Sequence, residues 1–405
     1  MKQFDCNEKY EADLQTVTKQ ILEKAGVSSP IAEREIIVMA NEGNTVAAKL
    51  YGDLVFYKKI YRKAPYLSAF SLYLRSAGIT IEEQAEDSKG SAGATCWHSE
   101  ENAYPLSYWI LGYYLVNYKR ESILQKSEKI PAIDVLSFPE RMALALRLAL
   151  ACIRRINVSG ALNLIGRILQ EASSNDRVFA AVKPVIEEEL LQKDFAECSL
   201  KISTCETKED CVKAAELFFM EAAKEGYIYA CNNLAAREAD QIIRMFHDYG
   251  LLSSDFSINA AEDPKKNDTG VLPGLSEESA PKEGFSPDSL KGEIERHVNE
   301  YVRYLKLSAD KYEPYAANRL GLFYMTGEIN NGRGKINYRS QTDSALAKTY
   351  FLKATVYPDA NSAWAYFNLI KYFHRDYDKD IALLNEHMDY IRQLNPEIYD
   401  LAIEL

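Results

Sequence analysis

Hydrophobic residues recur at spacings of three and four positions through most of the chain. Ala143, Leu146, Leu150 and Ile153 are one example. This spacing places apolar side chains along one face of a helix, which then packs against a neighbour. Runs that alternate hydrophobic and polar residues between Asn-Gly or Asp-Gly turns would indicate β-hairpins, but none is recognised along the chain. The pattern therefore predicts an all-α fold.

Three polar stretches interrupt the helical pattern. Residues 85–102 are small and polar and predict a loop of low order. Residues 121–138 predict an irregular connection that ends at Pro139, a residue suited to the first turn of the next helix. Residues 253–292 contain four prolines and eight acidic residues against four lysines, so they cannot bury enough apolar surface to offset the entropy of ordering.

These interruptions predict a domain organisation. We expect an N-terminal capping helix within residues 1–30 and a helical lobe over residues 31–252. A disordered acidic linker follows over residues 253–292. A second helical lobe with its cap then covers residues 293–405.

A short pattern of small and large residues recurs within both lobes. A small residue is followed four positions later by a large apolar residue and, in most copies, five positions later by another small one. The small residues that open the six copies are Ala47, Ser107, Ala161, Ala230, Ala316 and Ala365. We call these six the anchor residues. Because small residues flatten one face of a helix, we expect a second helix to approach closely there, with aromatics such as Phe219 and Phe351 wedged between successive helical hairpins.

These residues resemble the Sel-one-like repeat, a relative of the tetratricopeptide repeat. That family combines an Ala-Tyr-Tyr-x-Lys-Ala-Ala helix, a Gly, and an Ala-x-x-Asn-Leu-Gly-x-x-Tyr helix. The resemblance is best over residues 214–240 and 301–373, where Gly327 and Gly334 resemble the Gly-x-Gly loop of the family with an insertion of roughly ten residues. The large apolar residues of the pattern, Tyr51, Leu111, Ile165, Leu234, Leu320 and Leu369, are 60, 54, 69, 86 and 49 residues apart. The family repeats more tightly, so the resemblance implies an α/α solenoid of degenerate helical hairpins with a long polar insertion.

A solenoid of hairpins leaves a concave surface lined by one helix of each pair. We expect the residues two and six positions after each anchor to be exposed on this surface and to bind a peptide. They are Lys49, Asp53, Trp109, Tyr113, Asn163, Arg167, Asn232, Asn318, Phe367 and Lys371. The alternative is structural, because an Asn belongs to the family pattern and can simply hold adjacent turns together.

Composition and charge narrow the possible partners. The chain has 48 basic and 59 acidic residues, a net charge of −11, which argues against nucleic-acid binding. The start of the chain carries charge where an export signal needs an apolar segment, and no stretch is long enough to span a bilayer. We therefore expect a soluble cytoplasmic protein with no membrane insertion, whose partner is a protein or peptide.

No motif for catalysis, a cofactor or a metal emerges. The glycines of Gly332-Arg-Gly334 lack the spacing and the Ser or Thr of a phosphate-binding loop. Cys198, Cys205 and Cys211 have gaps of six and five residues between them, which suits packed thiols better than a disulfide or a zinc site. The five histidines are scattered, and we expect them at the surface.

The sequence thus favours a non-catalytic scaffold that binds a protein or peptide, and the family resemblance implies an adaptor or regulatory role. A second hypothesis is a ligand-responsive sensor whose two lobes move about the 253–292 linker. A hydrolase on a helical scaffold is the third. No nucleophile, base and orienting group at workable spacing support it.

Overall fold

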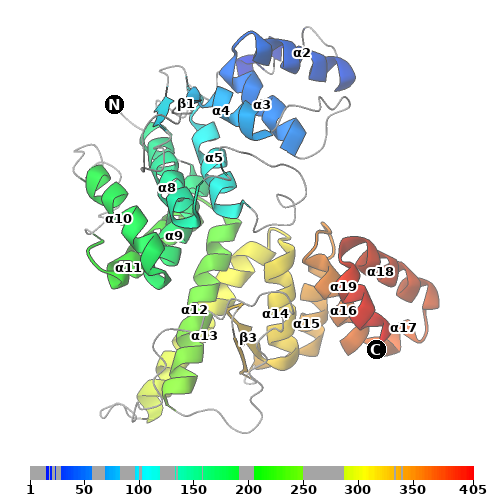
Figure 1. Cartoon of the computed structure of the whole chain (residues 1–405). Coiled ribbons are helices and arrows are strands. Elements are labelled where there is room, and N and C mark those ends of the chain that lie inside the picture. Colours follow the sequence, from blue (N-terminus) through cyan, green and yellow to red (C-terminus); the bar gives the residue numbers. More distant parts are fainter. Residues whose placement is uncertain are drawn as a thin grey trace. The chain divides into compact units, whose positions relative to one another are not determined.

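The computed structural model is mostly helical over the residues that it describes, which confirms the all-α prediction at that level (Figure 1). The described residues are 15–17, 19–20, 23, 29–56, 69–82, 96–99, 103–118, 133, 136–156, 158–190, 205–249, 287–332, 334–338 and 341–405. Among them, no helix combines the length and the apolar character required to cross a membrane.

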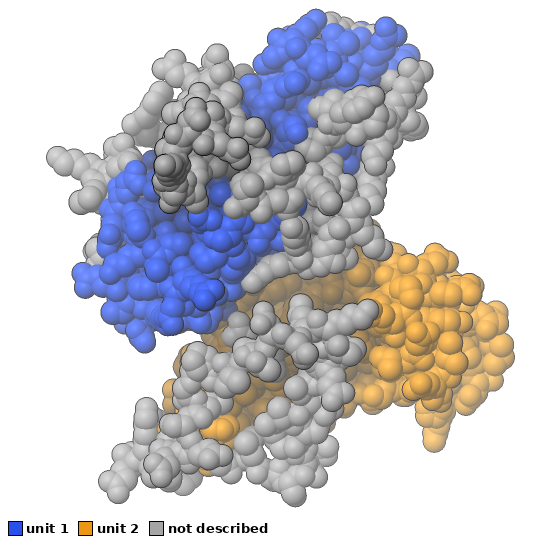
Figure 2. Space-filling view, viewed as in Figure 1, with its two compact units in different colours: residues 1–226 blue, residues 227–405 orange. Residues whose placement is uncertain are grey.

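The chain forms two compact units, Met1–Gly226 and Tyr227–Leu405, which are coloured separately in Figure 2. We call them unit 1 and unit 2. The described helices and strands of unit 1 are α2 (Ser29–Asn41), α3 (Thr45–Phe56), α4 (Ala69–Ser76), β1 (Ile79–Glu82), β2 (Cys96–Ser99), α5 (Leu106–Asn117), α8 (Phe138–Arg155), α9 (Ser159–Ser174), α10 (Asp176–Leu190) and α11 (Lys208–Lys224). Helices of unit 1 pack mainly on helices that are next to them or next but one in sequence, as in the pairs α3 with α4, α5 with α8, and α9 with α11.

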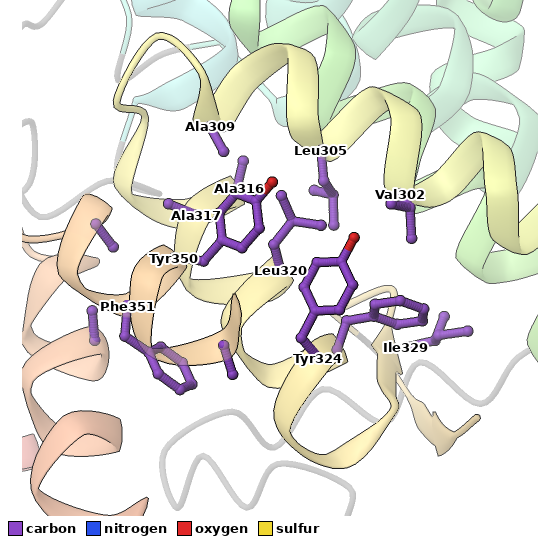
Figure 3. Packing of buried hydrophobic residues seen from close by; sticks show 14 of the residues in the cluster. Val302, Leu305, Ala309, Ala316, Ala317, Leu320, Tyr324, Ile329, Tyr350 and Phe351 are labelled. Atoms are coloured by element: carbon purple, nitrogen blue, oxygen red, sulfur yellow. The ribbon is translucent and has the colours of Figure 1, made fainter. Parts of the chain in front are cut away.

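Unit 2 follows the same scheme. Its described elements are α12 (Ile228–Asp248), α13 (Pro287–Ala309), α14 (Pro314–Thr326), β3 (Glu328–Asn330), β4 (Lys335–Asn337), α15 (Ser344–Lys353), α16 (Ser362–Tyr372), α17 (His374–Tyr377), α18 (Ile381–Leu394) and α19 (Pro396–Ile403). One continuous hydrophobic core runs through the unit, from Ala235 on α12 to Ala402 on α19. Figure 3 shows its centre, where Leu305 from α13, Leu320 from α14 and Tyr350 from α15 converge.

Local sequence signals account for several helix ends. Helix α8 begins at a capping box in which the Ser137 side chain accepts a hydrogen bond from the Glu140 amide and the Glu140 carboxylate accepts one from the Ser137 amide. Pro139 lies in the first turn, as predicted, because its missing N–H would have no partner there. Helix α14 ends at Gly327, which adopts the left-handed conformation with φ of 78°.

Two short antiparallel β-hairpins correct the prediction that strands are absent. Strand β2 pairs with β1 and lies inside residues 85–102, which we had expected to be a loop; Ile79, Thr80 and Ile81, all β-branched, supply the strand opposite it. Strands β3 and β4 occupy the insertion that follows Gly327. The turn between them contains Asn331-Gly332, with φ of 87° at Gly332, so the Asn-Gly signal was present and overlooked.

The unit boundary differs from the predicted lobes. Helix α12, which we assigned to the lobe of residues 31–252, belongs to unit 2 because it packs along α13. Helix α13 begins at Pro287, so the last six residues of the predicted 253–292 linker are helical. The rest of that linker up to residue 286, and most of the predicted capping helix in residues 1–30, lie outside the described residues.

Candidate partner-binding surface

The six anchor residues predicted from the repeated pattern are completely buried. Each has 0% exposure, and each lies on a different helix: α3, α5, α9, α12, α14 or α16. The large apolar residues four positions later are at most 3% exposed. The pattern therefore identified the buried stripe of six helices correctly.

The glycines of the pattern receive side chains from a helix that follows. A Cβ added to Gly166 on α9 would lie 2.5 Å from Cε1 of Phe219 on α11, and one added to Gly321 on α14 would lie 2.4 Å from Cδ1 of Phe351 on α15. Tyr73 on α4 covers Gly52 on α3 in the same way, with 2.6 Å between the added Cβ and Cε1. These contacts confirm that aromatic side chains lie where the small residues allow close approach.

One flank of these helices carries the residues predicted to bind a partner. Each helical residue is rotated about 100° from the one before, so the positions one before, two after, three after and six after an anchor fall within an arc of about 100°. We call this arc the anchor-flanking face. In unit 2 it belongs to α12, α14 and α16.

Hydrogen bonds join the anchor-flanking faces of neighbouring helices in unit 2. Asn368 on α16 donates from Nδ2 to Oδ1 of Asn318 on α14, at 2.9 Å, in a buried position. Asn232 on α12 donates from Nδ2 to Oε2 of Glu313, the N-cap of α14, at 3.1 Å. These two hydrogen bonds therefore link α14 to both α12 and α16.

Glu313 is an unusual residue at this junction because its carboxylate is buried, with 6% exposure. It accepts hydrogen bonds from the Ala316 amide at 2.7 Å and from Asn232. Burial raises the pKa of Glu313 above its usual value, and these hydrogen bonds partly oppose that shift. The carboxylate therefore caps α14 and ties α12 to it.

The predicted exposure of the binding residues was largely wrong. Asn163, Asn318 and Phe367 are buried, with 5%, 9% and 9% exposure. Of the ten predicted residues only Lys371 is exposed, and the remaining six, Lys49, Asp53, Trp109, Tyr113, Arg167 and Asn232, are half-buried. The physical reason is that the position two after the anchor faces the next helix of the same kind, as the pair Asn318 and Asn368 illustrates.

The same bridging occurs among the predicted residues of unit 1. Trp109 on α5 covers Gly160 at the start of α9, where an added Cβ would lie 2.6 Å from its Cε2. Arg167 on α9 donates to Oδ1 of Asn117 on α5 at 2.8 Å. These side chains hold neighbouring helices together, which supports the structural alternative for them.

Lys49 and Asp53 form a local ion pair on α3. The distance from Lys49 Nζ to Asp53 Oδ2 is 2.5 Å. Tyr73 on α4 donates its hydroxyl to the other carboxylate oxygen of Asp53 at 2.9 Å. Asp53 thereby orients the same tyrosine that covers Gly52.

The aromatic residue directly before the anchor is what the sequence reasoning missed. Tyr229 on α12 and Trp364 on α16 are 52% and 43% exposed. Tyr315 occupies the same position on α14 and is half-buried. We call these three residues the aromatic row. The signal was available, because an aromatic precedes the anchor Ala in all three copies of unit 2 and in none of unit 1.

Basic side chains accompany the aromatic row. The Arg319 guanidinium lies over the Tyr315 ring at 5.1 Å, and Lys371 Nζ lies 5.8 Å from the ring centre of Phe367, which itself contacts Trp364 edge to face. Arg319 is also paired with Glu328 on β3 at 3.4 Å. The anchor-flanking face of unit 2 therefore offers exposed rings and an exposed ammonium group at Lys371, a combination suited to apolar and acidic side chains of a partner.

Metal-ligating side chains do not gather into a site in the part of the chain that the structure describes. There, no three His, Cys, Asp or Glu side chains group closely enough to hold a metal ion. Two histidines differ from the expected surface position: His297 hydrogen bonds Glu238 at 2.5 Å, and His387 hydrogen bonds the Tyr377 hydroxyl at 2.8 Å. Each of these contacts joins two helices, α13 with α12 and α18 with α17.

Comparison with known proteins adds no relative. No protein-family model matches the chain, and no curated protein matches it. The resemblance to Sel-one-like repeats therefore stays a prediction that depends on the quoted residues.

Proposed function

We propose that this protein is a non-catalytic helical-repeat scaffold that binds an extended peptide segment of a partner protein on the anchor-flanking face of unit 2. The aromatic row carries the proposal. Three helices carry an aromatic residue at the same position, directly before the buried anchor residue. Two of these three aromatic residues are about half exposed. Exposed aromatic rings are common anchors of protein interfaces.

An extended peptide suits this surface for geometric reasons. Tyr229, Tyr315 and Trp364 occupy the same position on α12, α14 and α16, and the hydrogen bonds of Asn232 and Asn368 link α14 to the other two helices. A peptide in extended conformation rises about 3.3 Å per residue and turns alternate side chains to one face, so it can present several side chains to the rings of the row. The repeated contact between glycine and a following aromatic supports the further proposal that each unit is a short α/α solenoid of Sel-one-like hairpins.

The sensor hypothesis loses its structural basis. It required the predicted linker to separate two moving lobes. Helices α12 and α13, on either side of that segment, instead pack on each other within unit 2. We therefore keep the scaffold as the single proposal.

The experiment is a selection of binding peptides from a displayed library, followed by fluorescence titration with Trp364 as one reporter. We expect selected peptides to bind the protein and to lose affinity by about a hundredfold or more in the variant Tyr229→Ala, Tyr315→Ala, Trp364→Ala, because each of the three rings contributes about 1–2 kcal/mol. Calorimetry measures this loss. The matched control is Tyr312→Ala with Tyr357→Ala. Those two rings are also exposed, at 41% and 66%, but they lie in the turns after α13 and α15.

The outcomes separate clearly when circular dichroism shows that both variants are folded. Loss of binding in the aromatic-row variant alone supports the proposal. Equal binding by that variant and the unmodified protein would place the partner site elsewhere, and a selection that yields no peptide would reject peptide binding.

A further inference from the structure

Two cysteine thiols meet at the start of α11. Cys205 and Cys211 are both unbridged and buried, with 3% and 0% exposure. The Cys211 thiol hydrogen bonds to the Cys205 sulfur. Neither thiol has a role in the proposed peptide site, because α11 belongs to unit 1.

The local fold explains why these thiols are in contact. Thr207 caps α11 in a capping box with Asp210: the Thr207 amide donates to the Asp210 carboxylate at 3.0 Å, and the Asp210 amide donates to the Thr207 hydroxyl at 3.2 Å. This box sets the angle at which the chain enters the helix. Cys205 lies two residues before the cap and Cys211 is the fourth residue of the helix, so the two cysteines lie on either side of the capping box.

The environment distinguishes the two sulfurs from the other buried thiols. The hydrogen bond from Cys211 lowers the pKa of Cys205 and raises that of Cys211, while burial and the nearby Asp210 carboxylate oppose ionisation of Cys205. Burial raises the pKa of Cys152 to about 12 and also raises that of Cys231. Among these four buried thiols, Cys205 is the one whose pKa is lowered, and a lower pKa favours the thiolate that reacts.

We propose that Cys205 and Cys211 are a redox modification site, which peroxide converts into a reversible intrachain disulfide. In the first step the Cys205 thiolate attacks one peroxide oxygen, the O–O bond breaks, and a sulfenic acid and water form after proton uptake. In the second step the Cys211 sulfur, losing its proton, attacks the Cys205 sulfur and expels water. Two thiols and one hydrogen peroxide thus give one disulfide and two waters, and a small thiol reductant reverses the change.

The disulfide would fasten the residue that precedes the helix to its first turn. Helix α11 carries Phe219, which packs on Gly166 of α9. Oxidation therefore stiffens the start of a helix that is a main packing partner of α9, and slows hydrogen exchange of the first turn of α11.

The test uses the whole chain, treated with hydrogen peroxide in the folded state, blocked with iodoacetamide and digested with trypsin without reduction. Cleavage at Lys201, Lys208 and Lys213 separates Cys205, in residues 202–208, from Cys211, in residues 209–213. We expect a cross-linked pair of these two peptides in the oxidised sample only. It should vanish on reduction and in Cys205→Ser, and persist in Cys152→Ser and Cys231→Ser.

Three outcomes would overturn the proposal. Both peptides could remain alkylated in the folded protein although the urea-unfolded chain forms the cross-link. Cys205 could instead be bridged to Cys198, whose tryptic peptide covers residues 194–201. Peroxide could also convert Cys205 to the sulfinic acid with no cross-link, which mass spectrometry would detect as a gain of two oxygen atoms.

Discussion

Gly321 illustrates how a single hydrogen atom in place of a side chain sets the distance between two helices. Valine at this position would force Phe351 away, because even a bare Cβ lies 2.4 Å from its ring. We expect Gly321→Val to lower the free energy of unfolding of unit 2 by about 2–3 kcal/mol through overpacking. Urea denaturation followed by circular dichroism measures this change.

Gly292 supplies the matched control. It lies on α13, is exposed, and has nothing within 4 Å of the place where a Cβ would be. Gly292→Ala should leave stability unchanged or raise it by up to about 1 kcal/mol, because alanine is the better helix former. If Gly321→Val were as neutral as this control, the close contact with Phe351 would not exist in solution.

The buried carboxyl of Glu313 should make the stability of unit 2 depend on pH. Its pKa is raised in the folded state, so the unfolded chain loses this proton first as the pH rises above 4.5. The contribution of Glu313 to stability is therefore complete below that value and is lost as the pH rises through the folded-state pKa. Relative to Glu313→Gln, the unmodified protein should lose free energy of unfolding as the pH rises above 4.5.

Urea denaturation at several pH values measures this difference. In the variant Glu313→Gln the amide oxygen of the new side chain can still accept the hydrogen bonds of the cap, so the comparison isolates the charge. Parallel stability profiles for the two proteins would contradict the prediction.

The binding residues show where residue-level reasoning succeeds and where it stops. Anchor residues such as Ala316 were predicted correctly because burial of small residues follows from helical periodicity alone. The exposure of Asn318 was mispredicted because it depends on Asn368, a residue fifty positions away that no local pattern connects to it. The neighbouring helix determines which side of the buried stripe remains exposed to solvent.

At the scale of elements, the sequence predicted helices well and strands poorly. The start of α8 can be predicted from Ser137, Pro139 and Glu140, because capping interactions act within one helical turn. Each strand of β3 and β4 has only three residues, too short for an alternating pattern to emerge over the helical background. The Asn331-Gly332 turn was the remaining signal.

The imidazole of His387 is one of the groups through which helix α18 packs on α16 and α17. The His387 ring lies 4.7 Å from the Tyr366 ring, which also stacks on Tyr390, and its Nδ1 contacts the Tyr377 hydroxyl. Burial lowers the pKa of His387, against an opposing effect of Glu386. As the pH falls below 6.5 the unfolded chain is protonated first, so docking should weaken.

Hydrogen exchange of α18 measures this effect, with rates corrected for the intrinsic pH dependence. We expect lower protection at about pH 5.5 than at about pH 7.5, and a smaller difference in His387→Gln. His374→Gln, on the neighbouring helix α17, is the control. Equal pH sensitivity in His387→Gln would assign the effect to another group.

At the scale of the whole molecule, the two compact units predict separable stabilities. The continuous core of unit 2 contains no residue of unit 1, so a defect in one unit should not propagate fully to the other. Gly166→Val should accelerate hydrogen exchange mainly in α9 and α11, and Gly321→Val mainly in α14 and α15. A uniform acceleration over both units in either variant would show that the chain unfolds as one cooperative body.

The contact between a small residue and an aromatic ring recurs at uneven intervals along the chain. Gly52, Gly166 and Gly321 all receive an aromatic ring, yet the intervals between copies of the pattern vary from 49 to 86 residues. The chain therefore keeps this contact while the length of the connection between copies varies.

The packing of helices on close neighbours in the sequence also affects the rate and the order of folding. Contacts between neighbours in sequence require short loops to close, and chains dominated by such contacts fold fast. Helix α12 differs from the other helices of unit 2, because its partners α13 and β3 are far from it in sequence and residues 249–286 separate it from α13. Bringing such distant segments together costs more entropy than closing the short connections from α13 to α19. Helix α12 should therefore be the last helix of unit 2 to join, after the others have formed the surface on which it docks.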